Sequence, residues 1–195
     1  YQRCYFDLYG IEYDYYYIKA CKDGKYRFTT NPSKIKKQNY KELINVLENE
    51  KMNRIGNAKY ALSMRWYEKH TGTKEMEILK NNCYNFFRNY AKTKSSLNLW
   101  TCFKKYKQEV EGRGYVKSFV SCTQRATNDY CTRTSVAYLV NKYANPYIKN
   151  FFTSKGINVN EEQYALSEML QFIWRSAIPS KRMRTLFTNW LEEVS

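Results

Sequence analysis

The sequence predicts an α/β protein whose sheet lies mainly in the second half of the chain. The 195 residues are 43% hydrophobic and include only 7 Gly and 3 Pro, which fits a globular domain with a real core. Strand-like stretches at 97–103 and 115–122 are separated from one another by helix-length segments. This alternation predicts an α/β domain over residues 75–195, preceded by an accessory segment over 1–74.

The accessory segment opens with a strand-like pattern over residues 5–30. Asp23 and Gly24 lie between two aromatic and β-branched runs, and they predict a tight hairpin because glycine readily adopts a positive φ. Helices are then expected over 39–52 and 58–69.

The α/β domain is expected to start with a helix over 74–91, which carries an apolar stripe at helical spacing. A short helix should follow the first strand at 104–111. After the second strand, a long helix is expected over 133–152, broken at Pro146. Two further helices complete the expected order, at 162–177 and 180–193.

Basic residues dominate the charge of the chain. There are 33 Lys and Arg against 18 Asp and Glu, giving a net charge of +15. Such a balance indicates a partner rich in negative charge, nucleic acid and above all DNA. Basic and aromatic residues interleave in four clusters, a combination that can hold single strands; the alternative is an ordinary solvated basic surface. The clusters span 34–37, 88–94, 103–107 and 181–184, and their candidate contacts are Lys104, Lys105, Lys181, Arg182 and Arg184.

Several classes of site are not expected. The six cysteines lack paired spacing and His70 is the only histidine, so no metal site is predicted. The cysteines are expected to be free thiols of a cytoplasmic protein. No apolar run is long enough for a membrane span. The chain starts with Tyr1 rather than Met, and we expect it to be part of a longer protein.

No Walker A sequence is present. Phosphoryl transfer depends on gripping the phosphates, so this chain is not expected to hydrolyse a nucleotide by itself.

The helix expected over 162–177 offers the first candidate site. Glu168, Gln171 and Arg175 should share its polar face, where Arg can meet a phosphate in fork geometry and Gln can bond beside it. The alternative is a solvated face with a weak Glu–Arg pair. The opposite face should pack on the sheet through an apolar stripe, namely Leu166, Met169, Leu170, Ile173 and Trp174.

The polar segment 123–130, Thr-Gln-Arg-Ala-Thr-Asn-Asp-Tyr, offers the second candidate site. It follows the strand expected at 115–122, and ligands of open α/β sheets bind beyond the carboxyl ends of strands. The alternative is a loop that caps the next helix.

Taken together, this order of elements, the 123–130 segment and the Gln-Phe-Ile-Trp-Arg stretch at 171–175 resemble the second RecA-like domain of superfamily 2 helicases. More narrowly, the chain is similar to DEAD/DEAH-type helicase-like proteins of phages and mobile elements in Gram-positive bacteria. The resemblance implies a RecA-like sheet over about 75–190. It would also place Gln171 and Arg175 in motif VI at the ATP phosphates. It implies nucleic-acid contacts for Thr101 and for motif V, which would contain Thr123, Arg125, Thr127 and Asn128.

Two departures from motif VI bear on the expected activity. Trp174 stands at the glycine position, and Ile178 stands where the second arginine belongs. ATP and Mg²⁺ are therefore expected only when a first RecA-like domain, in the same or another chain, supplies the Walker A loop. The leading hypothesis is the nucleic-acid-binding, ATP-site-completing part of a helicase-like ATPase. The alternatives are a non-enzymatic DNA- or RNA-binding accessory protein of a phage or mobile element, and a purely structural interaction domain.

Overall fold

The computed structural model describes residues 1–32, 43–58, 60–124, 129–176 and 184–188. The chain forms two compact units, one of residues 1–40 with 144–160 and the other of 41–143 with 161–195. The boundary expected at residue 74 differs from this division, because the segment from 41 to 74 belongs to the unit that contains the main sheet.

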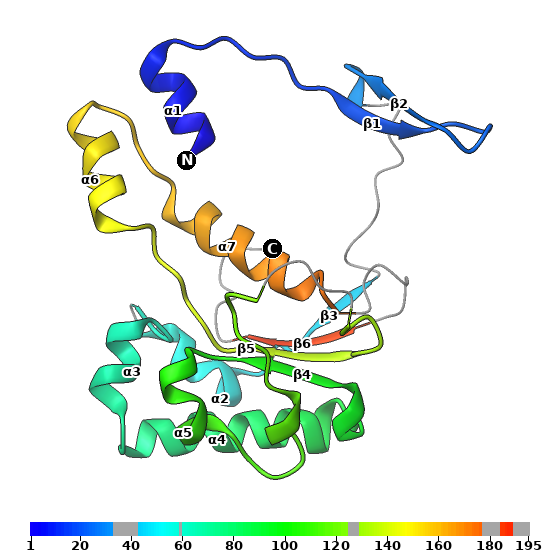
Figure 1. The fold of residues 1–195 in the computed structure, drawn as a ribbon. Helices are drawn as coiled ribbons and strands as arrows, with labels where there is room; N and C mark the ends of the chain where they lie inside the picture. Colours follow the sequence, from blue (N-terminus) through cyan, green and yellow to red (C-terminus); the bar gives the residue numbers. More distant parts are fainter. Residues whose placement is uncertain (33–42, 59, 125–128, 177–183, 189–195) are drawn as a thin grey trace. The chain divides into compact units, whose positions relative to one another are not determined.

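A parallel four-stranded sheet organises the larger unit (Figure 1). Its spatial order is β3, β6, β5 and β4, so the last strand of the chain lies between the first and third strands of the sheet. The expected α/β class is confirmed. The strands are β3 (Ile44–Val46), β4 (Asn98–Thr101), β5 (Ser135–Tyr138) and β6 (Arg184–Thr188).

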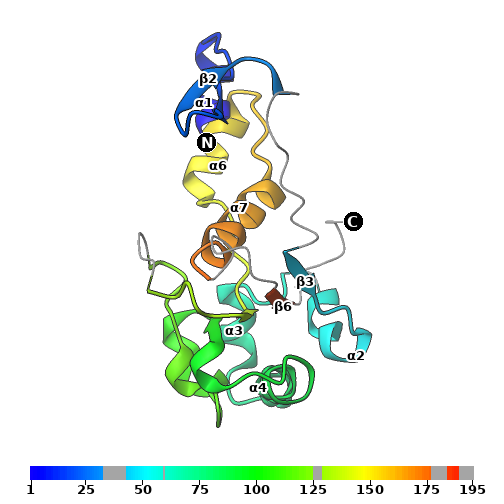
Figure 2. The same ribbon diagram turned by 90° about the vertical axis from the view of Figure 1, so that its right-hand side faces the viewer.

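Helices cover both faces of this sheet. Figure 2 looks nearly along β6 and shows α4 and α7 on opposite sides of that strand. Of the described helices, α7 (Glu161–Ile173) covers one face, and a group of shorter helices covers the other. That group consists of α2 (Glu50–Asn53), α3 (Met64–His70), α4 (Lys74–Asn85) and α5 (Lys107–Val110).

The alternation of side chains along the strands creates two cores. Trp100, Ala137 and Phe187 point to the group of shorter helices. Leu99, Val136 and Leu186, each one residue earlier, point to α7. Both faces are therefore buried, which is typical of parallel sheets.

Aromatic side chains fill the core between the sheet and the shorter helices, and the polar groups of two of them are hydrogen-bonded. Tyr67 donates its hydroxyl to the Leu139 carbonyl at 2.8 Å, and Trp100 donates its indole N–H to the Tyr115 carbonyl at 2.8 Å. The helix expected at 74–91 is confirmed as α4, which continues into a π-helical turn, η4 (Phe86–Tyr90). Phe86 stacks on Phe187 with ring centroids 5.3 Å apart, which ties α4 to the sheet.

The long helix expected over 133–152 is wrong. Residues 135–138 form β5, and Pro146 occupies the first turn of α6 (Pro146–Ser154) instead of kinking a longer helix. A short apolar run buried on both faces carries no periodicity that separates a strand from a helix. Proline suits the first helical turn, where its missing N–H has no intrahelical partner.

The same ambiguity explains two further corrections. Residues 44–46, expected within a helix over 39–52, form β3, and residues 184–188, expected within a helix over 180–193, form β6. Both segments are short, each contains only two apolar residues, and they pair with each other in parallel.

The strand expected over 115–122 is also wrong in most of its length. Residues 116–118 form the 3₁₀ turn η7, and only Phe119 makes a parallel bridge, with Trp100. The strand at 97–103 is confirmed as β4. The short helix at 104–111 is confirmed as the 3₁₀ turn η6 (Lys104–Tyr106) followed by α5.

The smaller unit contains the expected hairpin. Its strands are β1 (Tyr17–Ala20) and β2 (Tyr26–Thr29), and Gly24 has φ 76° in the turn between them. The start of the stretch expected to be strand-like, residues 5–9, belongs instead to the helix α1 (Gln2–Tyr9).

Two predictions, one on membrane spans and one on the cysteines, can be compared with the described residues only. None of their helices has the length and apolar character that a membrane span requires. All six cysteines are free; Cys83 and Cys102 are buried, whereas Cys131 is exposed.

The dependence of the sheet on β6 gives a first prediction. Phe187→Ala should destabilise the protein by roughly 3–5 kcal/mol, because it empties a fully buried position between β6 and α4. The control Tyr84→Ala, on the exposed side of α4, should change stability by less than about 1 kcal/mol. Urea denaturation measures both, and equal effects of the two variants would contradict the packing described.

Candidate functional site at the carboxyl edge of the sheet

All four strands end at the same edge of the sheet because they run parallel, and polar side chains gather there. The segments that follow Phe119 and β5 bring Cys122 and Lys142 together at this edge. Open α/β sheets bind their ligands beyond the carboxyl ends of the strands. We therefore describe this edge as the candidate site.

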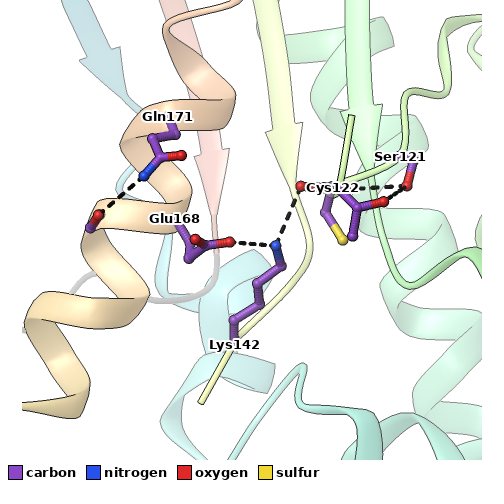
Figure 3. A network of polar contacts seen from close by, with 7 residues as sticks. Ser121, Cys122, Lys142, Glu168 and Gln171 are labelled. Atoms are coloured by element: carbon purple, nitrogen blue, oxygen red, sulfur yellow. Dashed lines mark hydrogen bonds and ion pairs between the residues drawn. The ribbon is translucent and has the colours of Figure 1, made fainter. Parts of the chain in front are cut away.

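Lys142 is the residue that connects the elements of this edge (Figure 3). Its Nζ lies 2.5 Å from Glu168 Oε2 on α7, and it donates to the Cys122 carbonyl at 3.3 Å. The two side chains are only 17% and 24% exposed, so water screens this pair less than the surface pairs. Lys142 thereby joins the end of β5 to α7 and to the segment after Phe119.

The sequence patterns did not single out Lys142. The available signal was its place after an uninterrupted apolar run, Val136 to Val140. It could be interpreted only once that run was known to be a strand.

Three hydroxyl side chains lie side by side under α7. Thr101, Tyr138 and Thr188 are in register across β4, β5 and β6, and all three are buried. Within the described residues, Thr101 Oγ1 and Thr188 Oγ1 have no hydrogen-bond partner. Thr101 was expected at a nucleic-acid backbone, but its hydroxyl is inside the domain.

Tyr138 and Cys122, near these hydroxyls, are neutral at ordinary pH. Burial raises the pKa of Tyr138 above its usual range, and the positive charge of Arg175 opposes that rise. Burial likewise raises the pKa of the Cys122 thiol, against the opposing charge of Lys142. Cys122 is therefore a thiol rather than a reactive thiolate.

The helix α7 packs on the sheet in a different rotation from the one expected. Ala165, Met169, Phe172 and Ile173 are buried, whereas Leu170 and Trp174, expected in the buried stripe, are 40% and 41% exposed. Phe172 takes the place against the sheet, next to Tyr138 at a ring distance of 5.6 Å. This rotation also turns Glu168 toward Lys142.

Gln171 and Arg175 lie in different surroundings. Gln171 is exposed and donates its amide to Ser167 Oγ at 3.4 Å. Arg175 lies just beyond the end of α7 and is partly buried, with its guanidinium carbon 5.6 Å from the centre of the Phe172 ring. Their role at an ATP site stays a prediction.

The second candidate segment is described only in part. Thr123 lies near the carboxyl edge, where its Oγ1 is 2.8 Å from Ser121 Oγ and its backbone N–H donates to the same oxygen at 3.3 Å. Arg125, Thr127 and Asn128 lie outside the described residues, and their proposed contacts stay predictions.

The basic clusters do not share one end of the sheet. Residues 88–94 precede the start of β4, whereas 103–107 follow its end. Lys104 and Lys105 are therefore at the carboxyl edge, in η6, and both are exposed. Residues 34–37, Lys181 and Arg182 lie outside the described residues, and Arg184 is described only as the first residue of β6.

No group of three or more metal-ligating side chains occurs among the residues whose placement is described. Chemically, this edge offers cations, hydroxyls and backbone groups, which suit the binding of an anionic partner better than nucleophilic catalysis.

The partly buried ion pair gives a second prediction. A double-mutant cycle with Lys142→Met and Glu168→Gln should yield a coupling energy of about 1–2 kcal/mol, because the pair is shielded from water. The matched cycle on Lys105 and Glu68, which are exposed and 3.9 Å apart, should yield less than about 0.5 kcal/mol. Similar couplings in the two cycles would show that the Lys142 pair contributes no more than a surface pair.

Comparison with known proteins places this fold in a family. The model of the YonV C-terminal Rossmann-like domain matches residues 38–191. The SPbeta prophage-derived protein YonV of Bacillus subtilis (strain 168) is 42% identical over 204 residues, which cover 98% of this chain and 49% of YonV. The chain thus spans about half the length of this relative. No solved structure matches the chain.

These matches support the expected resemblance at a coarser level, as a Rossmann-like fold with a relative from a prophage. By the extent of both matches, the chain belongs to the family of the YonV C-terminal Rossmann-like domain.

Proposed function

We propose that this domain binds single-stranded nucleic acid, with DNA as the expected form, at the carboxyl edge of its sheet. The observation that carries the proposal is the set of exposed cations that α3 and η6 present together at this edge. Lys104 and Lys105 come from η6, and Arg65 and Lys69 come from α3.

Contacts in the core hold these two elements next to each other. The rings of Tyr67 on α3 and Tyr106 on η6 stack with centroids 5.1 Å apart. On the surface, Glu68 lies 3.9 Å from Lys105. It is the single carboxylate that pairs with these four cations among the described residues, so the surface stays strongly basic.

Exposed aromatic rings lie at the same edge. The backbone N–H of Asn141 donates to the Leu62 carbonyl at 2.9 Å, which holds the segment before α3 against the end of β5. Tyr60 and Tyr143 meet there edge to face at 5.6 Å, and both are exposed. Cations beside exposed rings favour single strands, because the phosphates bind the cations while the bases stack.

A salt titration tests this proposal. Binding of single-stranded DNA should weaken with salt at a log–log slope of about −0.7 for each phosphate neutralised. The double variant Lys104→Ala, Lys105→Ala should reduce the steepness of that slope by about 1.4, because two contacts are lost. The matched variant Lys92→Ala, Lys94→Ala removes the same charge at the opposite end of β4 and should leave the slope nearly unchanged. Equal losses in the two variants would contradict a site at the carboxyl edge.

A helicase-like role is the second candidate. In it, Gln171 and Arg175 complete an ATP site whose Walker A loop and Mg²⁺ belong to another domain. Two observations favour it. The relative YonV is about twice as long as this chain, which leaves room for another domain. Arg175 lies just past α7, close enough for its charge to act on Cys122 and Tyr138.

Arg175→Ala tests this role in a protein that carries the domain together with a Walker A domain. ATP turnover should fall by about tenfold to a hundredfold, since a charged hydrogen bond to phosphate is lost, while strand binding stays. Arg113→Ala, in an exposed turn, serves as the control. Unchanged turnover in Arg175→Ala would remove this candidate and leave strand binding as the proposed function.

A further inference from the structure

A cleft of about 450 Å³ lies between α3, α4 and the 3₁₀ turn η3 (Arg54–Asn57). Small-molecule sites in proteins commonly measure about 300–1,000 Å³. Its lining combines cations, apolar side chains and aromatic rings, and no residue expected from the sequence to form a site belongs to it. The lining includes Arg54, Tyr60, Arg65, Trp66, Lys69 and Glu75.

The helix α3 presents two rows of side chains to this cleft. Arg65 and Lys69 are one turn apart and form a cationic row, while Trp66 and His70, also one turn apart, form an aromatic row beside it. The ring of His70 stacks on Trp66 at 4.6 Å with 29° between the planes. His70 Nδ1 donates to the Trp66 carbonyl at 2.7 Å, since a carbonyl oxygen can only accept. This bond fixes the orientation of the imidazole.

The charges of the cleft are unbalanced. Arg54, Arg65 and Lys69 are exposed and form no ion pair with any residue in the described part of the chain. Among the described residues that line the cleft, Glu75 is the single carboxylate. The Thr73 side chain and the backbone N–H of Glu75 itself lower the pKa of the Glu75 carboxyl, so it stays an ionised acceptor.

The backbone at the rim is held in an unfavourable conformation. Tyr60 and Leu62 have positive φ angles of 67° and 57°, which side chains other than glycine rarely adopt. Hydrogen bonds from the Ser63 and Asn141 N–H groups to the Tyr60 and Leu62 carbonyls fix this segment. In this conformation the Tyr60 side chain lines the cleft. Backbone strain of this kind is concentrated at ligand-binding sites.

We infer that this cleft binds a nucleoside phosphate. The phosphate lies among Arg54, Arg65 and Lys69, where fork-shaped and point-like donors can share its charge. The base packs against Tyr60 and the apolar lining of Ile55 and Ile78. The Glu75 carboxylate accepts from a sugar hydroxyl or a base amino group, a contact that inorganic phosphate cannot offer.

A free mononucleotide and the terminal nucleotide of a strand both carry this chemistry. If the ligand is the terminal nucleotide of a strand, the inference rests on the proposed strand binding. If the ligand is a free mononucleotide, it does not, because no strand surface is needed.

Calorimetry on the 195-residue chain tests the inference with four probes: the nucleoside 5′-monophosphates, the matching nucleosides, inorganic phosphate, and an oligonucleotide with or without a 5′-phosphate. A monophosphate should bind at least about tenfold more tightly than its nucleoside or inorganic phosphate, because it alone uses both parts of the cleft. Arg65→Ala and Lys69→Ala should each weaken it by about tenfold, whereas Arg113→Ala, outside the cleft, should not. Tyr60→Ala should reduce the preference for the monophosphate over inorganic phosphate.

The outcomes separate this site from the strand surface. The cleft shares Arg65 and Lys69 with the proposed strand surface but does not include Lys104 or Lys105. Loss of monophosphate binding in Arg65→Ala, together with normal monophosphate binding in the Lys104→Ala, Lys105→Ala variant, therefore supports the cleft even if single strands do not bind. A higher affinity for the 5′-phosphorylated oligonucleotide than for its unphosphorylated form identifies a strand end as the source. Equal affinity for monophosphate and inorganic phosphate, or no saturable binding by a folded protein, overturns the inference.

Discussion

The burial of β5 and β6 between two helical layers is the constraint on which the larger unit depends. Both strands are central, and each contributes side chains to both cores. This burial fixes the position of α7, because Phe172 packs on Tyr138 and Glu168 meets Lys142. It also fixes α3, because the Tyr67 hydroxyl bonds to the Leu139 carbonyl just past β5. The cleft and the basic edge are therefore built outward from these two strands.

The sequence predicted elements whose signals are local. The hairpin at Asp23-Gly24, the helix α4 with its apolar stripe and the strand β4 were all identified. The strands β3, β5 and β6 were expected to be helices, since each is a short segment whose strand partners lie far away in the sequence. The rotation of α7 was missed for a related reason, because Tyr138 and Lys142 decide it, and β5 and the segment after it had been interpreted as helix.

The residues of the candidate surfaces also differ in this respect, because some can be recognised from the neighbouring sequence and others only from the fold. Lys104 and Lys105 could be recognised because basic and aromatic residues alternate there within a few positions. The neighbouring cations of α3 could not, since their importance comes from η3 and α4, which close the cleft around them. The net charge of +15 indicated the class of partner but gave no location, and two of the basic clusters lie at opposite ends of β4.

The place of β6 in the sheet has a consequence for how the protein is made. Among the described strands, β3 pairs with β6 alone, and β6 comes from residues 184–188 of a chain that is synthesised from the other end. A ribosome therefore releases β3, β4 and β5 well before the strand that joins β3 to the others exists. Until then the nascent chain exposes unpaired strand edges and apolar surface, which favour association with other chains. Completion of the sheet therefore waits for the synthesis of β6.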